Sequence, residues 1–276
     1  MMRMIDKYSV EHRKPFIQRL RHTANVILNN MNMRWVKPLD CGVQSLFVVG
    51  CGHSGTTLVT SRLARAPSVY SPSWETGLFL PIHGLYAAST SYKVLANTAL
   101  SNGKSILVEK TPKHVHCARR ILAVLPTARF IVVTRNPLDT CASLYRRFPD
   151  LPYCIERWQI DNSAALSLFK HDNQCFHLRY EDITHDPERS FGDLFRFAGV
   201  EWSTDFLSPG RTPFDDFPHS GNMAKRAAEV AEPILPRVNT WPETLNVRQA
   251  KQILQRTMPL AAKLGYITAP HELSRK

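Results

Sequence analysis

The residues best suited to chemistry begin with a glycine-rich run, Gly50-Cys51-Gly52-His53-Ser54-Gly55-Thr56-Thr57. Its glycine spacing is that of the phosphate-binding pattern G-x-x-x-x-G. The run follows the apolar residues 46–49, which favour a buried strand, and precedes a helix that we expect to start near Thr57. Glycines let the backbone wrap an anion, and a helix N-terminus adds N–H donors and the positive end of its dipole. The run therefore predicts a phosphate site.

The loop departs from that of enzymes that cleave nucleoside triphosphates. Those enzymes carry Lys and then Ser or Thr after the second glycine, whereas Thr56 and Thr57 stand there in this chain. The sequence also lacks an apolar, strand-like run that ends in Asp, the usual magnesium ligand of such sites. The pattern favours a reaction on a phosphoanhydride that needs no metal ion.

A second polar motif follows the apolar run 129–134 and reads Arg135-Asn136-Pro137-Leu138-Asp139-Thr140-Cys141-Ala142-Ser143. On a helix that starts near Pro137, one face is shared by Asn136, Thr140, Ser143 and Arg147. An arginine beside a helix N-terminus is a suitable site for another anion. Because both motifs follow strands, we expect them at the carboxyl edge of one sheet.

Both motifs resemble those of sulfotransferases that use 3′-phosphoadenosine 5′-phosphosulfate (PAPS) as donor. The run 52–57 is similar to their 5′-phosphosulfate loop, P-[KR]-[ST]-G-T-[ST], with His53 where the family has Lys or Arg. The motif 135–143 is similar to their 3′-phosphate motif, R-[DN]-P-x-[DE]-x-x-x-S. The resemblance extends over about 45–205. It implies sulfuryl transfer from PAPS, as co-substrate, to an acceptor hydroxyl without a metal ion.

The resemblance also implies which residues bind the donor. The 5′-phosphosulfate loop would consist of Gly52, His53, Ser54, Gly55, Thr56 and Thr57. Arg135 and Ser143 would hold the 3′-phosphate. Tyr180, in a stretch similar to the family's Y-E-D motif, would lie near the nucleotide. The segment 208–226 corresponds to a part that closes over the nucleotide, and its candidate clamps are Ser220, Lys225 and Arg226.

Candidate catalytic residues lie between the two phosphate motifs. An acceptor hydroxyl must lose a proton as it attacks sulfur, and charge that develops on the leaving oxygen needs a cation. Glu75 and Lys110 resemble in position the catalytic Glu and Lys of the tyrosylprotein sulfotransferase branch. The resemblance implies that Glu75 is the general base and that Lys110 and His53 stabilise the bridging oxygen. Alternative bases are Glu109, His114 and His116.

The composition fits a globular protein with an anionic partner. The apolar fraction of 43% and the net charge of +12 suit a nucleotide, an acidic glycan or an anionic membrane, and we expect no nucleic-acid partner. Six cysteines without a C-x-x-C pair indicate reduced thiols and a cytoplasmic protein. His114, His116 and Cys117 are metal ligands by type, but helical spacing would separate them, so we predict no metal site.

Strand-like and helix-like segments alternate along the chain. We expect strands near 46–49, 105–109, 129–134 and 175–178, and helices from Thr57, from Pro137 and over 113–125, 187–198 and 247–264. This order predicts an α/β, P-loop-type fold in three layers, with a central, mainly parallel sheet flanked by helices. We expect a basic helical arm over 1–40 and a sulfotransferase domain over 41–276. The arm shows no signal-peptide pattern and could contact an acidic membrane peripherally.

Two other functions fit parts of the sequence. The glycine spacing also suits a P-loop kinase of a nucleoside or small metabolite, which magnesium-dependent turnover of ATP would reveal. The departure at His53 suits a non-catalytic nucleotide- or glycan-binding module, which would bind PAPS without transfer. The acceptor is open among a glycan, a lipid-linked sugar, a small alcohol and a peptidyl tyrosine.

Overall fold

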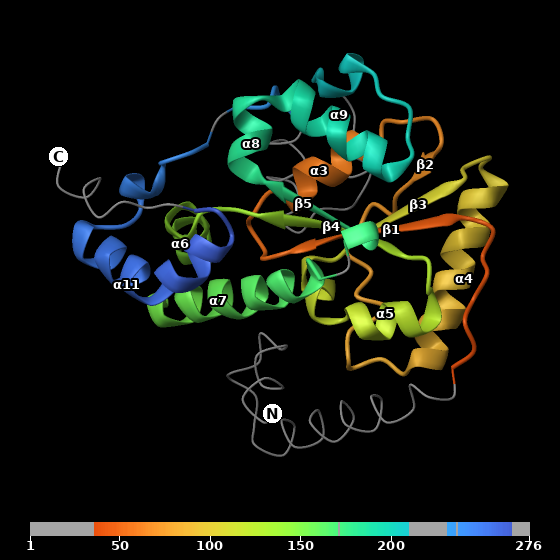
Figure 1. The fold of residues 1–276 in the computed structure, drawn as a ribbon, viewed down its shortest axis with the longest axis horizontal. Coiled ribbons are helices and arrows are strands. Elements are labelled where there is room, and N and C mark those ends of the chain that lie inside the picture. Colours follow the sequence, from red (N-terminus) through yellow and green to blue (C-terminus); the bar gives the residue numbers. More distant parts are fainter. Residues whose placement is uncertain (1–35, 171, 210–230, 236, 267–276) are drawn as a thin grey trace.

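The computed structural model of the protein describes residues 36–170, 172–209, 231–235 and 237–266. These residues form a five-stranded sheet in the order β2-β3-β1-β4-β5, and every neighbouring pair is parallel (Figure 1). The strands are β1 (Gln44–Gly50), β2 (Val69–Tyr70), β3 (Ile106–Lys110), β4 (Arg129–Thr134) and β5 (Cys175–Arg179). The parallel sheet confirms the predicted α/β class, and each expected strand is present.

Helices connect the strands and cover both faces of the sheet (Figure 1). The α-helices are α3 (Thr56–Leu63), α4 (Leu85–Ser101), α5 (Ala118–Val124), α6 (Pro137–Tyr145), α7 (Leu151–Leu168), α8 (Tyr180–His185), α9 (Pro187–Ala198) and α11 (Val247–Lys263). The short 3-10 helices are η2 (Pro112–His116), η3 (Asp172–Gln174), η4 (Thr204–Leu207) and η5 (Trp241–Glu243). No helix in the described part of the chain is both long and apolar enough to cross a bilayer.

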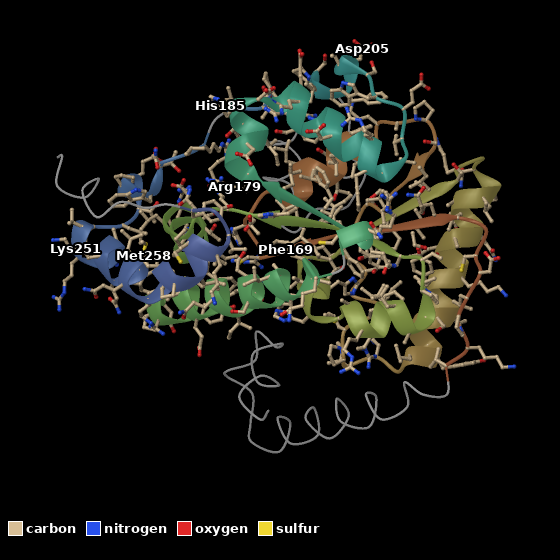
Figure 2. The ribbon with its side chains drawn as sticks, viewed as in Figure 1. Phe169, Arg179, His185, Asp205, Lys251 and Met258 are labelled. Atoms are coloured by element: carbon tan, nitrogen blue, oxygen red, sulfur yellow. The ribbon has the colours of Figure 1, made fainter. Side chains whose placement is uncertain are left out.

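Alternate residues of the strands face two separate hydrophobic cores. In β1, Phe47 and Val49 pack with α4 and α5, whereas Leu46 and Val48 pack with α3 and α9 on the other face. Successive side chains of a strand point to opposite faces, and both faces of this parallel sheet are covered. Side chains fill the space between the sheet and its helices (Figure 2). Polar chemistry is therefore left to the strand ends.

A third core joins α6, α7 and α11 beside the sheet. Trp158 of α7 is fully buried in it, and its indole N–H donates to the carbonyl oxygen of Arg135 at 3.1 Å. Helix α11 starts with a capping box in which Asn246 and Gln249 each accept from the other's backbone N–H. This core fixes the position of the turn from β4 into α6, which carries the second polar motif.

The expected single helix over 113–125 is wrong. The structure has η2 and α5 instead, and the break falls at Cys117. The imidazole of His114 is fully buried and bonds Glu109 of β3 at 2.7 Å, which ties this segment to the sheet. The backbone N–H of Cys117 then donates to the carbonyl of His114 at 2.8 Å, the tighter pattern of a 3-10 turn. A buried polar contact has overridden the apolar periodicity.

The expected polar stripe on α6 is also shorter than predicted. Helix α6 ends at Tyr145, so Arg147 lies beyond it. The hydroxyl of Thr140 donates to the carbonyl oxygen of Asn136 at 2.8 Å, within its own helix. Such back-bonding satisfies a threonine locally. Asn136 and Ser143 are members of the stripe whose side chains contact other segments, Glu181 of α8 and His53 of the loop.

Candidate functional site

The phosphate loop connects β1 to α3 through two glycines with positive φ. Gly55, the N-cap of α3, has φ 98°, and a Cβ atom there would lie 2.6 Å from the ring of Tyr180. Gly50 has φ 146°, and a Cβ atom there would collide with the carbonyl oxygen of Val133 in β4. L residues with side chains rarely adopt these conformations. The loop is therefore shaped by its neighbours and admits only glycine at both positions.

Polar groups of the loop remain available to a ligand. The hydroxyl of Ser54 is fully buried and makes no hydrogen bond with any described residue. Helix α3 begins at Thr56 without a side-chain cap, so its first N–H groups also need an acceptor. Buried polar atoms without partners are rare in folded proteins and often indicate a binding site. An anion at the start of α3 would satisfy these donors.

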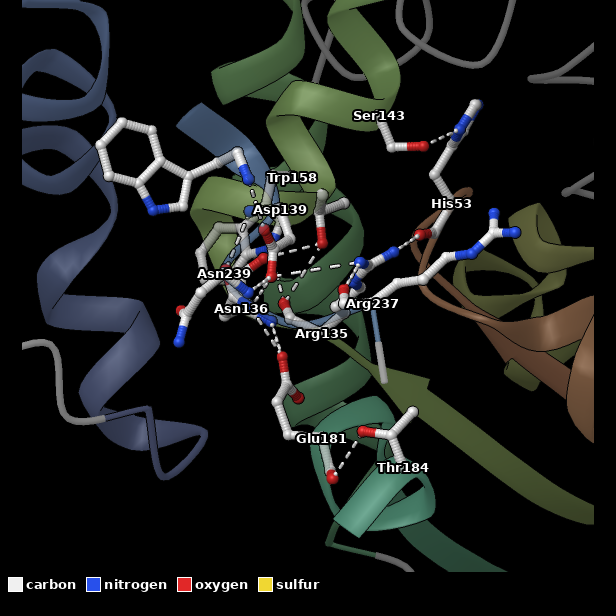
Figure 3. Close-up of polar contacts among 12 residues, drawn as sticks. His53, Arg135, Asn136, Asp139, Ser143, Trp158, Glu181, Thr184, Arg237 and Asn239 are labelled. Atoms are coloured by element: carbon white, nitrogen blue, oxygen red, sulfur yellow. Dashed lines mark hydrogen bonds and ion pairs between the residues drawn. The ribbon is translucent and has the colours of Figure 1, made fainter. Parts of the chain in front are cut away.

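Arg135 is held at the end of β4 by contacts on several sides (Figure 3). Its guanidinium stacks over the ring of Tyr180 at 4.3 Å and donates to the carbonyl oxygens of His53, at 3.4 Å, and Arg237. Asp139 lies 4.0 Å away as an ion-pair partner. The Nε atom is buried and has no hydrogen-bond partner among the described residues. A fixed guanidinium with a free donor suits an anion such as phosphate.

The motif that follows Arg135 holds three chain segments together (Figure 3). Asn136 caps α6 by accepting from the N–H of Asp139 at 2.9 Å. The carboxylate of Asp139 accepts from the N–H groups of Asn239 and Trp241, at 2.8 and 3.0 Å. Glu181 of α8 accepts from both the backbone and the side-chain nitrogen of Asn136. The acidic position of the motif is thus structural, since it anchors the segment before α11.

His53 connects the two phosphate motifs. It has φ 72°, a rare value for a residue with a side chain, and its Nδ1 lies 2.9 Å from the hydroxyl of Ser143 in α6 (Figure 3). The sequence led us to expect this imidazole at the 5′ end of the donor. The structure directs it toward Ser143, a residue expected to contact the 3′-phosphate. A direct side-chain contact therefore joins the loop to the second motif.

Glu75 and Lys110 form an ion pair at the same edge of the sheet. Lys110 is the last residue of β3 and pairs in register with Val48, two positions before the loop. Its Nζ atom lies 2.9 Å from Oε1 of Glu75. The lysine side chain is only 1% exposed, whereas that of Glu75 is 37% exposed. The lysine is therefore enclosed by the protein, whereas part of the Glu75 side chain is exposed to solvent.

Glu109, an alternative base, belongs to a buried network instead. Its carboxylate accepts from the hydroxyls of Thr111 and Thr76, at 2.6 and 2.7 Å, and pairs with Nδ1 of His114 at 2.7 Å. Nε2 of His114 accepts a hydrogen bond from the N–H of Phe79 at 3.2 Å. The ring proton is therefore on Nδ1, which donates a hydrogen bond to Glu109. The network positions the segment next to Glu75. His116, the other alternative, bonds Asp161 at 2.7 Å.

The carboxylate of Glu109 should stabilise the fold. Burial opposes its charge, but His114, Thr111 and Thr76 outweigh that effect and hold its pKa below the usual value. We expect Glu109→Gln to lower the free energy of unfolding at neutral pH by about 1.5–3 kcal/mol.

Urea titrations of wild type and Glu109→Gln measure this difference. Because the folded pKa is lowered, the stabilisation is complete above the unfolded pKa of about 4.3 and is lost as the pH falls through the folded value. The difference in the free energy of unfolding between wild type and Glu109→Gln should therefore become smaller below about pH 4. Glu188→Gln, at an exposed position of α9, is the control. Equal stability of wild type and Glu109→Gln at neutral pH would contradict this role.

Residues 79–204 match the sequence profile of the Sulfotransferase family. The matched segment covers slightly less than half of the chain. It contains Lys110, the second phosphate motif and Tyr180, and it begins after the phosphate loop.

Solved sulfotransferases share the fold of this chain. The sulfotransferase domain from the Synechococcus PCC 7002 olefin synthase has a TM-score of 0.62 at 18% identity, over 85% of this chain and 99% of that domain. Mouse sulfotransferase SULT7A1, complexed with PAP, has a TM-score of 0.51 at 13% identity, over 87% of this chain and 90% of that one. An uncharacterized protein of Aquifex aeolicus is 23% identical over 60% of this chain, which spans 27% of that relative's length. The chain therefore has the sulfotransferase fold.

This sulfotransferase fold brings most of the expected site residues to one edge of the sheet. The loop 52–57, Glu75, Lys110, Arg135 and Ser143 all follow or adjoin the ends of β1, β3 and β4. Ser220, Lys225, Arg226 and the arm up to residue 35 lie outside the described residues. Within the described residues, no group of three or more His, Cys, Asp or Glu side chains could hold a metal ion.

Two cations of the site were not predicted from the sequence. Arg157 of α7 approaches the loop so closely that a Cβ atom on Gly52 would meet its Nη2 at 3.0 Å. Lys113 of η2 is half-buried and lies within electrostatic reach of Arg157 and Glu75. Neither residue belongs to a recognisable motif. Arg157 is brought to the loop by α7, which packs against η2, the short helix that carries Lys113.

Proposed function

We propose that this chain is a PAPS-dependent sulfotransferase that moves a sulfuryl group to an acceptor hydroxyl. The hydrogen bond between His53 and Ser143 carries the proposal, because it joins a phosphate loop to a second anion motif. PAPS has phosphate groups at both its 5′ and 3′ ends. Two adjoining anion sites suit this donor better than a nucleotide with one phosphate chain. The family match over 79–204 supports the same donor and favours it over a kinase substrate.

The residues present fit such a donor. The buried hydroxyl of Ser54 and the buried Nε of Arg135 have no hydrogen-bond partners among the described residues. Unsatisfied buried groups of this kind become favourable when a ligand accepts from them. In the proposed complex the loop 52–57 holds the 5′-phosphosulfate, Arg135 and Ser143 hold the 3′-phosphate, and Tyr180 supports Arg135 by stacking.

The catalytic step assigns a role to each member of the Glu75–Lys110 pair. When bound, PAPS supplies an activated sulfur atom whose bridging oxygen leaves with the 5′-phosphate. Glu75 takes the proton of the acceptor hydroxyl while the new O–S bond forms and the bridging O–S bond breaks. Lys110 holds the carboxylate in place and supplies positive charge where the leaving oxygen keeps the electron pair. The products are adenosine 3′,5′-bisphosphate (PAP) and a sulfate ester.

The carboxylate–lysine pair supports an arrangement like that of the tyrosylprotein sulfotransferase branch, in which a Glu is the base.

We also propose that residues 41–276 form the donor-binding domain and that the protein works in the cytoplasm. All six cysteines lie in the described part of the chain and no disulfide bond joins any two of them, which favours a reducing compartment. The acceptor classes remain a glycan, a lipid-linked sugar, a small alcohol and a peptidyl tyrosine.

A transfer assay tests the proposal. The protein is incubated with PAPS labelled on sulfur, a panel of these four acceptor classes and EDTA. We expect label on one acceptor, with PAP formed in equal amount, and the same rate when magnesium replaces EDTA. The loop carries Thr56 where a Walker lysine would stand, so no metal is required by this account. Magnesium-dependent phosphoryl transfer from ATP would contradict it.

Arg135 should determine the preference for a 3′-phosphate. Its guanidinium is buried and fixed, and a charge-assisted bond to phosphate contributes about 1.5–3 kcal/mol, roughly a tenfold to hundredfold gain in affinity. We expect Arg135→Ala to remove most of the difference in dissociation constant between PAP and AMP, as measured by calorimetry. Arg129→Ala, at the opposite end of β4, is the matched control and should leave that difference intact. An unchanged preference in Arg135→Ala would remove Arg135 from the 3′ site.

A further inference from the structure

Arg157 of α7 lies against the backbone of the phosphate loop. A Cβ atom on Gly52 would be 3.0 Å from Nη2 of Arg157, well inside the usual separation of non-bonded heavy atoms. Gly52 thus makes room for the guanidinium. The sulfotransferase pattern has Pro at this position, and the proline ring would carry the Cβ atom that Gly52 lacks. The replacement of Pro by Gly and the approach of Arg157 are therefore physically connected.

The guanidinium of Arg157 is anchored on the side away from the loop. Its Nε lies 3.5 Å from Oδ2 of Asp161, and its Nη1 donates to the hydroxyl of Tyr153 at 3.0 Å. His116 holds the other oxygen of Asp161 at 2.7 Å. These contacts leave Nη2, the atom nearest to the loop, without a hydrogen bond to any described residue. A preorganised donor thus points at the loop.

Arg157 is held in its positively charged form. Burial opposes it, but the carboxylate of Asp161 outweighs burial and raises the pKa of Arg157 above its usual value. Lys113 interacts electrostatically with Arg157, Asp161 and Glu75, and burial together with the charge of Arg157 lowers the pKa of Lys113. Arg157 is therefore the more strongly held positive charge on this side of the loop.

His53, by contrast, contacts the second motif. Its imidazole bonds Ser143 of the second motif at 2.9 Å, although it occupies the place of the loop's usual Lys or Arg. The loop residues 50–57 thus contain no Lys or Arg, the residues that the family pattern has within the loop. Arg157 approaches the loop one residue earlier, at Gly52.

We propose that Arg157 replaces the missing loop cation and binds the 5′ phosphosulfate end of the donor through Nη2. This proposal rests on the proposed function, because it assumes a donor with a charged 5′ group in the loop. Two departures from the family pattern, at Gly52 and His53, then have one explanation. The cation has moved from the loop to α7, and the loop has lost a side chain to admit it.

The test compares two ligands that differ only at the 5′ end, PAP and adenosine 3′-monophosphate. Calorimetry gives both dissociation constants for wild type and for Arg157→Gln. We expect Arg157→Gln to raise the dissociation constant of PAP about 10- to 100-fold, the range of a charge-assisted hydrogen bond. The dissociation constant of adenosine 3′-monophosphate should change less than about twofold. Arg196→Gln, which removes an exposed arginine of α9, should change neither constant.

Two further variants protect the test against misfolding of Arg157→Gln. Arg157→Lys keeps the charge beside Asp161 and should retain more PAP affinity than the Gln variant. Gly52→Ala places a Cβ atom against Nη2 of Arg157. It should weaken the binding of PAP but not that of adenosine 3′-monophosphate. In the double variant with Arg157→Gln, it should cause little further loss of PAP affinity.

The outcomes separate this inference from the proposed function. Wild type that binds PAP more tightly than adenosine 3′-monophosphate, together with an unchanged PAP constant in Arg157→Gln, would overturn the role of Arg157 alone. An equal loss for both ligands would also overturn it, because that result indicates a structural residue. Wild type without any preference for the 5′-phosphate would count against the proposed function itself.

Discussion

Replacing Glu75 by Gln should lower turnover by about 10²–10⁴-fold, the usual contribution of positioned proton transfer. Gln keeps the shape of the side chain and removes its ability to take a proton. The dissociation constant of PAP should change less than about twofold, because the loop and Arg135 hold the donor. The carboxylate is 37% exposed, so its loss should leave the fold intact. Turnover with an acceptor found in the panel and calorimetry with PAP measure the two effects separately.

Two results for Glu75→Gln would contradict the role of Glu75 as general base. Near-normal turnover in Glu75→Gln would reject this carboxylate as the base. An equal loss of turnover and PAP binding would give Glu75 a structural role through its pair with Lys110. Glu188→Gln, an exposed carboxylate on α9, serves as the control for a loss of negative charge elsewhere.

Replacing Lys110 by Met should lower turnover by about 10²–10³-fold, as the removal of one preorganised donor at a developing charge does in other enzymes. The ammonium is almost fully buried, so water cannot substitute for it. Lys104→Met, before the opposite end of β3, is the matched control and should retain activity. Turnover of Lys110→Met within a few-fold of wild type would remove Lys110 from the catalytic step.

A double-mutant cycle distinguishes a shared role from two separate ones. Glu75 and Lys110 are 2.9 Å apart, and groups in direct contact usually show a coupling of about 0.5–3 kcal/mol. We expect Glu75→Gln with Lys110→Met to lose less activity than the product of the single losses. A purely multiplicative result would mean that the ion pair has no catalytic consequence.

The features that could be predicted from the sequence are those set by short-range patterns. The loop 50–57 follows a buried strand and precedes a helix, and the structure has this order. Arg135 and Asn136-Pro137 mark the end of β4 and the start of α6, because proline suits the first helical turn and asparagine caps it. Parallel strands then bring both motifs to one edge of the sheet.

The features that could not be predicted depend on contacts between distant segments. Arg157 reaches the loop only because α7 packs beside η2 and β1, and nothing in its neighbouring residues indicates this. The break at Cys117 arises from the bond between His114 and Glu109, which competes with helical periodicity. The orientation of His53 depends on Ser143, ninety residues away in the sequence. Side-chain partners across the sheet edge decide these details.

The central claim is that this chain recognises a nucleotide with phosphate at both the 5′ and the 3′ end. Calorimetric titration of the wild-type protein with PAP and with AMP, in one buffer containing EDTA, tests it most directly and needs no acceptor. We expect PAP to bind at least about tenfold more tightly than AMP, since Arg135 would form a charge-assisted bond to the 3′-phosphate. Equal affinities for PAP and AMP would contradict the account.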